Sequence, residues 1–492
     1  MSFWDQIEPY WELLTAAGAI LGPVLSAFTI GFILVTKKNS TSAVAWCLLV
    51  FFLPLIGPLF FLLFGYQHVR VPLARKRRHR RLFESKHPRQ RAEVTRGSSA
   101  AARSGDQSAA PWEEVSRLAR RFGAFPVTSD NRIKFYHEGR PALEDMLEAI
   151  RNARHHVHLE TFIFQPDETG KLFLEALTQK ARENVEVRLL YDAMGSHRLP
   201  QRLLRPLHKA GGKSSVYLPI SPLRRRIQIN MRNHRKILVV DGRIAFTGGL
   251  NVGSEYCGDN PRFGFWRDTH LRLEGQAVAG LQRVFIEDWD FAAGENLYAE
   301  PYFPQLEGGG SCPVQIIDSG PDREQKPIRE IYFAAMLRAR KRLWIASPYF
   351  VPDAGLLDAL SLAGYLGVDV RLLTQDHPDK WIPLFAARYY LGEVLNAGVK
   401  VYQYTKGMMH SKVVLVDGEW GSVGSANLDN RSMYLNFEAN CLIYSPEAVA
   451  ELEDAFRDDL KHAIRLERHA YRRRPLSSRL LDNACRLLSP IL

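Results

Sequence analysis

Two long apolar stretches without charged residues dominate the first part of the hydrophobic pattern. Residues 14–35 and 43–64 are each long enough to cross about 30 Å of hydrocarbon as a helix. Acidic residues before the first stretch and the presence of a second stretch argue against a cleaved signal peptide. The pattern therefore predicts a two-helix membrane hairpin, although Pro54 and Pro58 leave open a second segment that is re-entrant or interfacial.

Beyond Trp112 the pattern changes to short β-branched runs that alternate with amphipathic helical stretches, as is typical of an α/β fold. The alternation repeats, because residues 157–164 and 185–190 have counterparts in the same order at 343–350 and 368–373. We therefore predict two similar α/β domains. The expected boundaries are 1–69 for the hairpin, 70–111 for a basic juxtamembrane segment and flexible linker, 112–306 and 307–470 for the two domains, and 471–492 for a C-terminal basic amphipathic segment.

The charge of the 492-residue chain is concentrated in two places. Lys and Arg number 65 against 53 Asp and Glu, a formal net charge of +12, and residues 70–81 and 463–492 together account for all of it. The first run follows the hairpin and is expected on the cytoplasmic side. Because both runs border hydrophobic segments, we expect anionic membrane lipids and not nucleic acid as partners. Five cysteines without a CxxC pair indicate a reducing setting.

The residues able to carry chemistry fall at the same place in both halves. Each half contains the pattern His-x-Lys-x(4)-Asp and, after a glycine-containing turn, an Asn. The members are His234, Lys236, Asp241 and Asn251 in the first half and His410, Lys412, Asp417 and Asn427 in the second. Side chains two positions apart in an extended chain point to one face, so each His and Lys reach a common site. Two copies in register with a whole-domain repeat favour a functional site over solvated side chains at a strand edge.

These residue types suit phosphoryl transfer on a phosphodiester. Lys and Asn side chains can bind the nonbridging oxygens in the ground and transition states. One imidazole can attack phosphorus, and the other can protonate the leaving alkoxide and then deprotonate the incoming alcohol. We assign His234 as the nucleophile and His410 as the acid and base, while the similarity of the two halves supports the reverse assignment almost equally.

Two carboxylates are predicted to orient the imidazoles by binding the ring nitrogen that faces away from the substrate. We pair Asp268 with His234 and Glu438 with His410, because each carboxylate lies downstream of its histidine in the same half. The substrate-binding part of the site is therefore expected to contain four residues: Asn251, Asn427, Asp268 and Glu438.

Asp241 and Asp417 complete the catalytic motif of each half. Their position at the end of the predicted strand favours a structural role, in which they pin the strand through hydrogen bonds or an ion pair. The sequence shows no clustered set of metal ligands, and its nearest approach to a P-loop lacks the first glycine, where Leu207 stands. We expect no metal and no cofactor.

The duplicated His-x-Lys-x(4)-Asp pattern resembles the phospholipase D superfamily. The arrangement of the chain resembles the bacterial cardiolipin synthases within it, and the segments that carry this likeness are the hairpin with Trp46 and residues 53–57, residues 427–432, residues 435–438 and residues 474–490. One departure is Gly249, where the superfamily often has the Ser found at Ser425.

The resemblance implies two phospholipase D-type domains, each a mixed β-sheet flanked by helices, in pseudo-twofold arrangement. It implies a phosphatidyltransferase that converts two phosphatidylglycerol molecules to cardiolipin and glycerol through a phosphohistidine; a phospholipase D or another phosphatidyltransferase acting on membrane phospholipids is the alternative. The expected location is the bacterial inner membrane, multi-pass, with the catalytic domains on the cytoplasmic side. Homo-oligomerisation stays open. The C-terminal helix is expected either to lie in the headgroup region or to pack on the catalytic domain.

Overall fold

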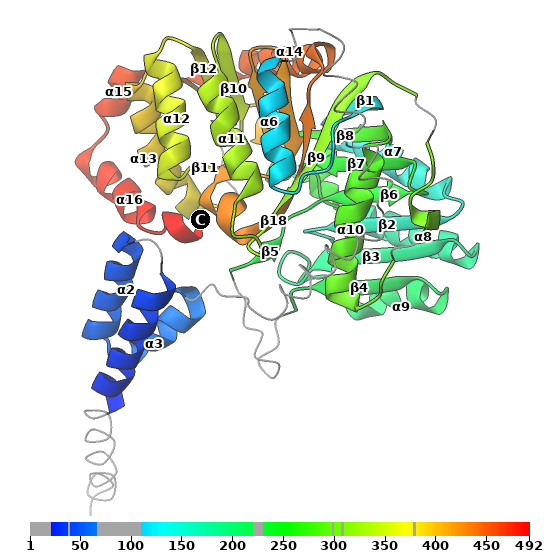
Figure 1. Cartoon of the computed structure of the whole chain (residues 1–492), viewed down its shortest axis with the longest axis horizontal. Helices are drawn as coiled ribbons and strands as arrows, with labels where there is room; N and C mark the ends of the chain where they lie inside the picture. The colour runs from blue at the N-terminus through cyan, green and yellow to red at the C-terminus, as the bar shows by residue number, and fades with distance from the viewer. Residues whose placement is uncertain are drawn as a thin grey trace, which may run out of the picture. The chain divides into compact units, whose positions relative to one another are not determined.

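The computed structural model describes residues 21–37, 40–65, 110–219, 230–297, 300–306, 309–376 and 380–492. They divide into two compact units (Figure 1). The first holds the N-terminal hairpin, and the second holds the repeated α/β region. The basic run 70–81 and the linker predicted after it lie outside the described residues.

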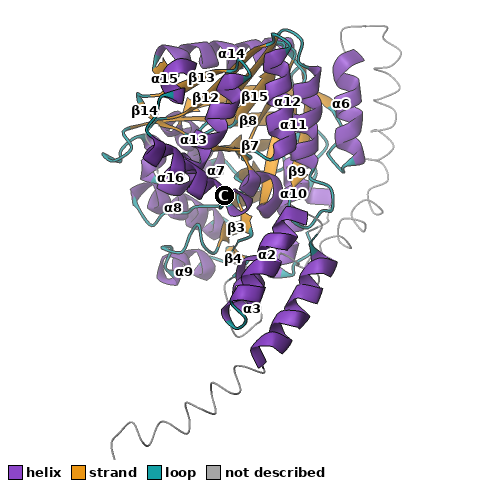
Figure 2. Cartoon of the chain, turned by 90° about the vertical axis from the view of Figure 1, so that its left-hand side faces the viewer, coloured by secondary structure: helices purple, strands orange, loops and turns teal. Residues whose placement is uncertain are grey.

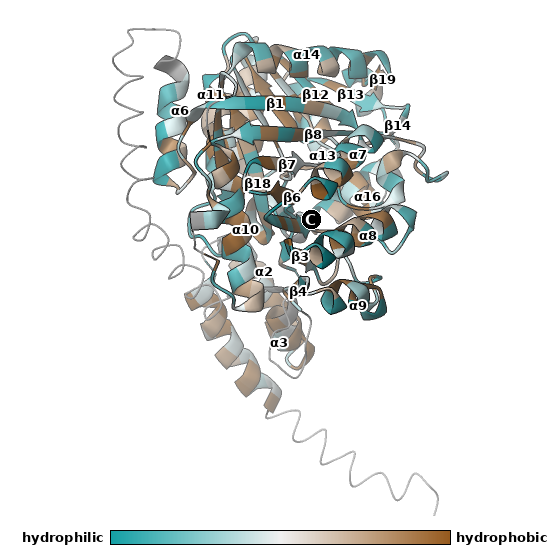
Figure 3. Cartoon of the chain, turned by 90° about the vertical axis from the view of Figure 1, so that its right-hand side faces the viewer, coloured by the Kyte–Doolittle hydropathy of each residue, from teal (hydrophilic) through white to brown (hydrophobic). Residues whose placement is uncertain are grey.

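The N-terminal unit is a helical hairpin formed by the two apolar stretches. Its described elements are helical residues 21–36, α2 (Ser40–Phe52), α3 (Ile56–Phe60) and the π-helical turn η1 (Phe61–Gly65). The Ser26 hydroxyl donates to the carbonyl oxygen of Val50 at 3.1 Å and links the two arms, which Figure 3 colours largely as hydrophobic. Pro54, which has no N–H to donate, lies where the second arm breaks between α2 and α3. No helix among the described residues is long and apolar enough to cross a bilayer.

The second unit contains the elements of both repeats. Those of the first half are α6 (Ala110–Arg121), β1 (Thr128–Glu138), α7 (Gly139–Arg151), β2 (His156–Thr161), α8 (Glu168–Arg182), β3 (Glu186–Asp192), α9 (Gln201–Lys209), β4 (Lys213–Tyr217), β5 (Arg232–Asn233), β6 (Ile237–Val240), β7 (Ile244–Gly248), η4 (Ser254–Cys257), β8 (Phe265–Gly275), α10 (Val278–Ala293) and η5 (Glu300–Tyr302). Those of the second half are β9 (Cys312–Ser319), α11 (Pro327–Arg338), β10 (Arg342–Ala346), β11 (Phe350–Val351), α12 (Ala354–Tyr365), β12 (Asp369–Gln375), α13 (Trp381–Asn396), β13 (Lys400–Tyr404), β14 (Gly407–Met409), β15 (Val413–Val416), β16 (Trp420–Gly424), β17 (Leu428–Asp429), η6 (Arg431–Leu435), β18 (Asn436–Ile443) and α14 (Pro446–Lys461). The chain ends with β19 (Ala463–Arg465), α15 (Arg468–Arg472), α16 (Leu476–Arg486) and η7 (Ser489–Ile491).

The two halves have the same strand order and share one sheet. The order is β4-β3-β2-β6-β7-β8-β1 in the first half and β13-β12-β10-β15-β16-β18-β9 in the second. Strands β2, β3 and β4 are parallel, whereas β6, β7, β8 and β1 are antiparallel, and the second half repeats this mixture. Antiparallel pairing of β1 with β9 joins the halves. The predicted mixed α/β fold with two related halves is confirmed.

Helices cover the sheet on both faces, as Figure 2 shows with strands enclosed between helices. In the first half α7, α8 and α9 pack against one another, while α10 contacts β4, β6 and β9; α11 to α13 and α14 repeat this division in the second half. Equivalent caps start two of these helices, because the carboxylates of Asp167 and Asp353 accept the N–H of Gly170 and Gly355. Each half has its own core under its crossover helices.

A third core is common to both halves. It includes Ile237 and Leu281 of the first half and Val413 and Leu452 of the second, together with residues of β1 and β9. Because burial on both faces demands apolar residues throughout a strand, β6 and β15 read Ile-Leu-Val-Val and Val-Val-Leu-Val without alternation. The halves are therefore held together by continuous hydrophobic packing as well as by the sheet, and the ends of β6 and β15 are fixed relative to each other.

Candidate active site

Two short strands cross from one half of the second unit to the other. β5, just before His234, pairs in parallel with the start of β18, and β14, just before His410, pairs in parallel with the start of β8. The backbone N–H of His234 donates to the Phe437 carbonyl at 2.9 Å, and that of His410 donates to the Arg267 carbonyl at 2.7 Å. His234 is thereby placed beside Glu438, the residue after Phe437, and His410 is placed beside Asp268, the residue after Arg267.

The carboxylates of Glu438 and Asp268 each pair with the histidine of the opposite half. Nδ1 of His234 lies 3.1 Å from both carboxylate oxygens of Glu438, and Nδ1 of His410 lies 2.7 Å from Oδ2 of Asp268. The predicted pairing of Asp268 with His234 and of Glu438 with His410 is therefore wrong. The prediction that these two carboxylates bind the far ring nitrogens holds with the partners exchanged.

The strand order explains the exchange. Within one half, β7 lies between the strand that follows the histidine and the strand that begins with the carboxylate. Strands are spaced by about 4.8 Å, so the starts of β6 and β8 are roughly 10 Å apart, too far for a direct hydrogen bond. The segment before each histidine instead runs directly beside the carboxylate strand of the other half.

The site is nearly closed, and burial keeps both imidazoles neutral. His234 is 9% exposed and His410 is 8% exposed. Burial lowers the pKa of His234 well below its usual range, with further lowering by Lys236 and Lys412, and burial lowers the pKa of His410 to about 4. Since Lys412 of the second half influences His234 of the first, the two motifs meet in one site. With Nδ1 held by a carboxylate, each ring presents Nε2 for chemistry.

The two carboxylates respond differently to their surroundings. Burial raises the pKa of Glu438 to about 7 in spite of the opposing charge of Lys236. Burial also acts to raise the pKa of Asp268, but Lys412 and His410 outweigh it and leave the pKa below its usual value. Asp268 is therefore the more firmly ionised partner, and its hydrogen bond to His410 is the shorter one. An imidazolium is better stabilised at His410 than at His234.

Both lysines are buried beside their histidines. The ammonium of Lys236 donates to the carbonyl oxygen of His234 at 2.6 Å, and the ammonium of Lys412 donates to the carbonyl of His410. Burial, with the charge of Lys412 acting in the same direction, lowers the pKa of Lys236 to about 7. Two cations brought close together in a buried site suit an anion such as a phosphodiester.

Gly249 and Ser425 occupy corresponding positions with different consequences. The Ser425 hydroxyl donates to Glu438. A Cβ on Gly249 would lie 1.9 Å from Oδ1 of Asp268. The departure from serine in the first half is therefore a steric necessity, because the Asp268 carboxylate fills the space that a side chain would need.

Asp241 and Asp417 lie at the other end of their strands from the histidines. The Asp241 carboxylate accepts the backbone N–H groups of Arg154, His155 and His156, and Asp417 accepts three equivalent groups at 340–342. Both have positive φ, 54° and 56°, and each precedes a glycine in a tight turn. Neither carboxylate has a described contact with the imidazoles or ammonium groups of the site, so the structure does not support a catalytic role for Asp241 and Asp417. Their contacts fit the structural role.

The two asparagines differ in how far their side chains are engaged. Asn251 accepts the N–H of Ile163 at 3.1 Å and donates to the Tyr256 hydroxyl at 3.0 Å. Asn427 is 4% exposed, and its side-chain oxygen has no hydrogen-bond partner among the described residues. The side chain of Asn427 is thus the freer of the two to meet a substrate.

Sequence reasoning missed three residues around the site. Arg235, 1% exposed, donates to the Glu438 carbonyl at 3.2 Å and to Asp318 at 3.1 Å, and pairs with Asp288. It thereby connects the halves behind His234. Arg235 occupies the variable position of the motif, between His234 and Lys236 and before the apolar strand, and that position gave no sign of this role.

The other two are aromatic. The Phe162 ring meets the His234 ring edge-on with centroids 5.0 Å apart, and the Trp266 ring lies 5.3 Å from that of His410. They exclude water from one side of each imidazole. Among the described residues, no group of three or more His, Cys, Asp or Glu side chains is arranged to hold a metal ion.

Comparison with known families identifies both units. The family described as "Cardiolipin synthase, PLD-like domain" matches residues 146–289 and 332–460, and "Phospholipase_D-nuclease N-terminal" matches residues 24–65. The two longer matches each contain one His-x-Lys-x(4)-Asp motif, and the shorter one coincides with the hairpin.

Similar proteins cover nearly the whole chain. A cardiolipin synthase of Geobacillus kaustophilus is 38% identical over 496 residues, which cover 98% of this chain and 95% of the relative. One from Staphylococcus aureus is 39% identical over 478 residues, 96% of each chain. Among solved structures, a phosphatidylserine synthase of Haemophilus influenzae aligns with a TM-score of 0.60 at 16% identity, covering 77% of this chain and all of that one. At this identity the structural likeness concerns the fold alone.

Proposed function

The chain belongs to the cardiolipin synthase family of the phospholipase D superfamily, and we propose that it joins two phosphatidylglycerol molecules to give cardiolipin and glycerol. The observation that supports this most directly is the pair of nearly buried imidazoles, each held at Nδ1 by a carboxylate of the opposite half. Such a site can hold one phosphodiester and provide a nucleophile and an acid on its two sides.

In the first step Nε2 of His234 attacks phosphorus, and the bond from phosphorus to the headgroup glycerol oxygen breaks. The glycerol oxygen takes the proton from Nε2–H of His410, and free glycerol leaves. Although burial lowers the pKa of His410 to about 4, a bound phosphodiester brings negative charge to both rings and raises their affinity for a proton. Lys236, Lys412 and Asn427 bind the nonbridging oxygens, whose charge increases in the transition state.

In the second step a glycerol hydroxyl of another phosphatidylglycerol replaces the departed glycerol. Nε2 of His410 removes the hydroxyl proton, the oxygen attacks phosphorus, and the bond from phosphorus to Nε2 of His234 breaks. One diester is exchanged for another, so neither redox change nor nucleotide is required, and His234 returns to its neutral form.

The unequal carboxylates support His234 as the nucleophile and His410 as the acid and base. The acid must be protonated when the first step begins and again when the second step ends, which is easier beside the firmly ionised Asp268 than beside Glu438, whose pKa is raised to about 7. We also propose that residues 112–306 and 307–470 are the two domains that supply one half-site each, with the Asn251 side chain linking Ile163 to Tyr256 beside the site.

We place the enzyme at the bacterial inner membrane through the N-terminal hairpin. The apolar arms and the family match over residues 24–65 support this, and the basic run 70–81 supports catalytic domains on the cytoplasmic side. Labelling of the partly exposed Cys257 with a membrane-impermeant maleimide tests the orientation. It is expected to require membrane permeabilisation, and labelling of intact spheroplasts would contradict the orientation.

The reaction is tested by supplying the purified chain with phosphatidylglycerol as sole lipid. Equal amounts of cardiolipin and glycerol are expected. Phosphatidic acid as the dominant product would instead identify a phospholipase D. Since both histidines serve one site, His234→Ala and His410→Ala are each expected to remove turnover, and substantial cardiolipin formation by both single variants would overturn the shared site.

A further inference from the structure

The C-terminal helix α16 is attached to the second unit through polar residues. Asp482 is the buried residue of this helix, whereas Leu476, Leu480 and Leu487, the last just beyond its end, are 69%, 62% and 74% exposed. Helices that pack on a protein surface normally bury their apolar stripe. Here α16 lies against α13 and its leucines face outward. Packing of the helix on the catalytic domain, one of the two roles that the sequence left open, therefore does not explain why these leucines are exposed.

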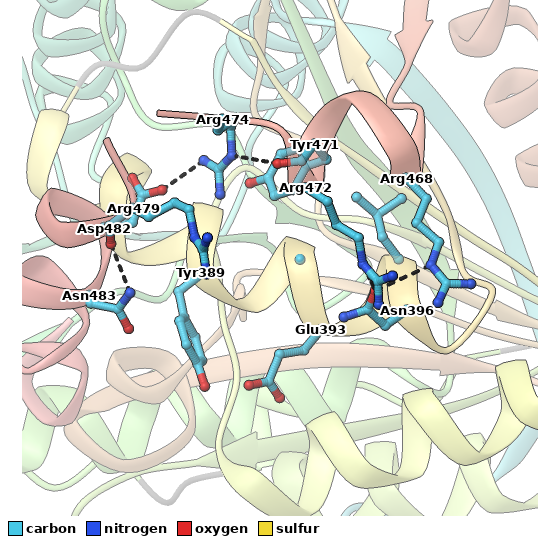
Figure 4. A pocket seen from close by; sticks show the side chains of 12 residues that line it. Tyr389, Glu393, Asn396, Arg468, Tyr471, Arg472, Arg474, Arg479, Asp482 and Asn483 are labelled. Carbon is cyan, nitrogen blue, oxygen red and sulfur yellow. Dashed lines mark hydrogen bonds and ion pairs between the residues drawn. The ribbon is translucent and has the colours of Figure 1, made fainter. Parts of the chain in front are cut away.

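A cavity of about 420 Å³ lies between α13 and the C-terminal helices (Figure 4). Tyr389, Glu393 and Asn396 of α13 line one part of it. The rest is lined mainly by basic side chains, namely Arg468, Arg472, Arg474 and Arg479. Two acidic side chains, Glu393 and Asp482, oppose these four arginines, so the cavity has an excess of positive charge.

Two of the four guanidinium groups are held in place by a neutral acceptor. Nε of Arg468 and Nε of Arg472 both donate to the amide oxygen of Asn396, at 3.3 and 3.1 Å. This neutral acceptor draws two cations together, and no ion pair joins either arginine to a carboxylate among the described residues. Arg474 is fixed separately, by Asp482 at 2.7 Å and by the Tyr471 ring, whose centroid is 3.8 Å away.

This arrangement fits a phosphate. Several guanidinium groups directed at one cavity provide the planar donor pairs that bind phosphate oxygens. On a helix with 100° per residue, Arg479 and Asn483 form a stripe next to that of Leu476, Leu480 and Leu487. A ligand that satisfies both stripes at once carries a phosphate and adjoins an apolar phase.

We propose that the cavity between α13, α15 and α16 is a noncatalytic site for the phosphate of an anionic phospholipid headgroup, bound while the exposed leucines of α16 enter the acyl boundary of the bilayer. This inference rests on the proposed function only in taking a bilayer as the surrounding phase.

Contacts at the end of the chain relate this site to the catalytic one. The carbonyl oxygen of Leu492 accepts the N–H of Arg431 at 2.7 Å, and the Tyr390 hydroxyl donates to Ser489 at 3.0 Å. Arg431 lies on the segment between Asn427 and Glu438, both of which belong to the catalytic region. Residues 489–492, which follow α16, therefore connect the proposed lipid site to the segment that carries Asn427 and Glu438.

The test measures hydrogen exchange at residues 476–488 in the full-length His234→Ala chain, which does not turn over. The chain is reconstituted in phosphatidylcholine nanodiscs with and without phosphatidylglycerol. Phosphatidylglycerol is expected to slow exchange about tenfold, and Arg472→Gln/Arg479→Gln and Leu480→Ser/Leu487→Ser are each expected to remove this protection. Arg457→Gln and Leu362→Ser, exposed residues on α14 and α12, are the matched controls and keep it.

Three results would overturn the proposal: no protection by phosphatidylglycerol, protection that survives Arg472→Gln/Arg479→Gln, or equal protection when inorganic phosphate is added to phosphatidylcholine nanodiscs. The last result would identify free phosphate as the ligand. Because the chain is inactive throughout, none of these results depends on whether the active enzyme makes cardiolipin.

Discussion

The crossed pairing of His234 with Glu438 predicts a large effect of removing one charge. In Glu438→Gln the amide keeps the shape of the side chain but no longer offsets the positive charge that develops on His234. Two unit charges 3.1 Å apart interact by about 5 kcal/mol at an effective dielectric constant of about 20. Since each 1.4 kcal/mol corresponds to a factor of ten in rate, kcat is expected to fall by about 10³- to 10⁴-fold.

The assay is the initial rate of cardiolipin formation from phosphatidylglycerol in mixed micelles, with kcat and KM determined separately. KM is expected to change little, because Glu438 contacts the histidine and not the lipid. Asp454→Asn, an exposed carboxylate on α14 with 74% of its side chain accessible, is the control and keeps the parental rate. A Glu438→Gln chain with more than a tenth of the parental kcat would refute the reasoning.

Three further predictions concern the surroundings of this pair. Gly249→Ala displaces the Asp268 carboxylate, since the new Cβ would lie 1.9 Å from Oδ1, and is expected to lower kcat by about 100-fold. Gly309→Ala, whose Cβ meets nothing closer than 3.9 Å, serves as the control, and equal rates for the two variants would show that the carboxylate can move freely. Arg235→Met leaves Asp288 and Asp318 without their shared buried cation, and denaturant unfolding is expected to show a free energy of unfolding lower by about 3–5 kcal/mol. The surface variant Arg457→Met is the control and loses less than about 1 kcal/mol; a loss as small as this at Arg235 would contradict its bridging role. The profile of kcat/KM against pH is expected to be bell-shaped with its maximum near pH 7, because rising pH removes the charge of Lys236 and falling pH protonates Glu438, both with pKa about 7. Lys236→Arg is expected to remove the alkaline limb, and a flat profile from pH 5 to 9 would contradict the assignment.

The hydrophobic pattern was sufficient to predict the α/β class of the fold and its repetition, whereas the mixed sheet was implied by the family resemblance. β6 and β15 are short apolar runs because helices cover both of their faces, and this leaves a direct signal in the sequence. The two-residue spacing between His and Lys predicted that they lie close together, and in the structure each Lys ammonium bonds to the carbonyl oxygen of its His. Asp241 and Asp417 could be recognised as strand-end residues from their position after these runs.

The pairing of histidines with carboxylates could not be read in the same way. His234 and Glu438 are 204 residues apart, and the strand that aligns them, β5, contains only two residues. Such a strand leaves no periodicity. Its place depends on how β1 and β9 join the halves, which the sequence of either half alone does not encode.

The C-terminal helix shows a similar limit. Leucines at helical spacing predict an amphipathic helix, but not whether its apolar face turns inward or outward. That choice depends on Asp482, which is buried and forms an ion pair with Arg474, and on the acceptor that Asn396 provides on α13. Both contacts join segments that have no recognisable relation in sequence.

The central claim is that both halves form one catalytic site, and the number of covalent adducts per chain tests it most directly. Phosphatidylglycerol labelled in its phosphatidyl part is mixed with enzyme, the reaction is quenched at alkaline pH within one turnover, and histidine-bound label is located by peptide mass spectrometry. One phosphatidyl adduct per chain, on His234, is the predicted result, with none in His234→Ala. Two adducts per chain, one on each histidine, would mean that each half works alone and would contradict the account.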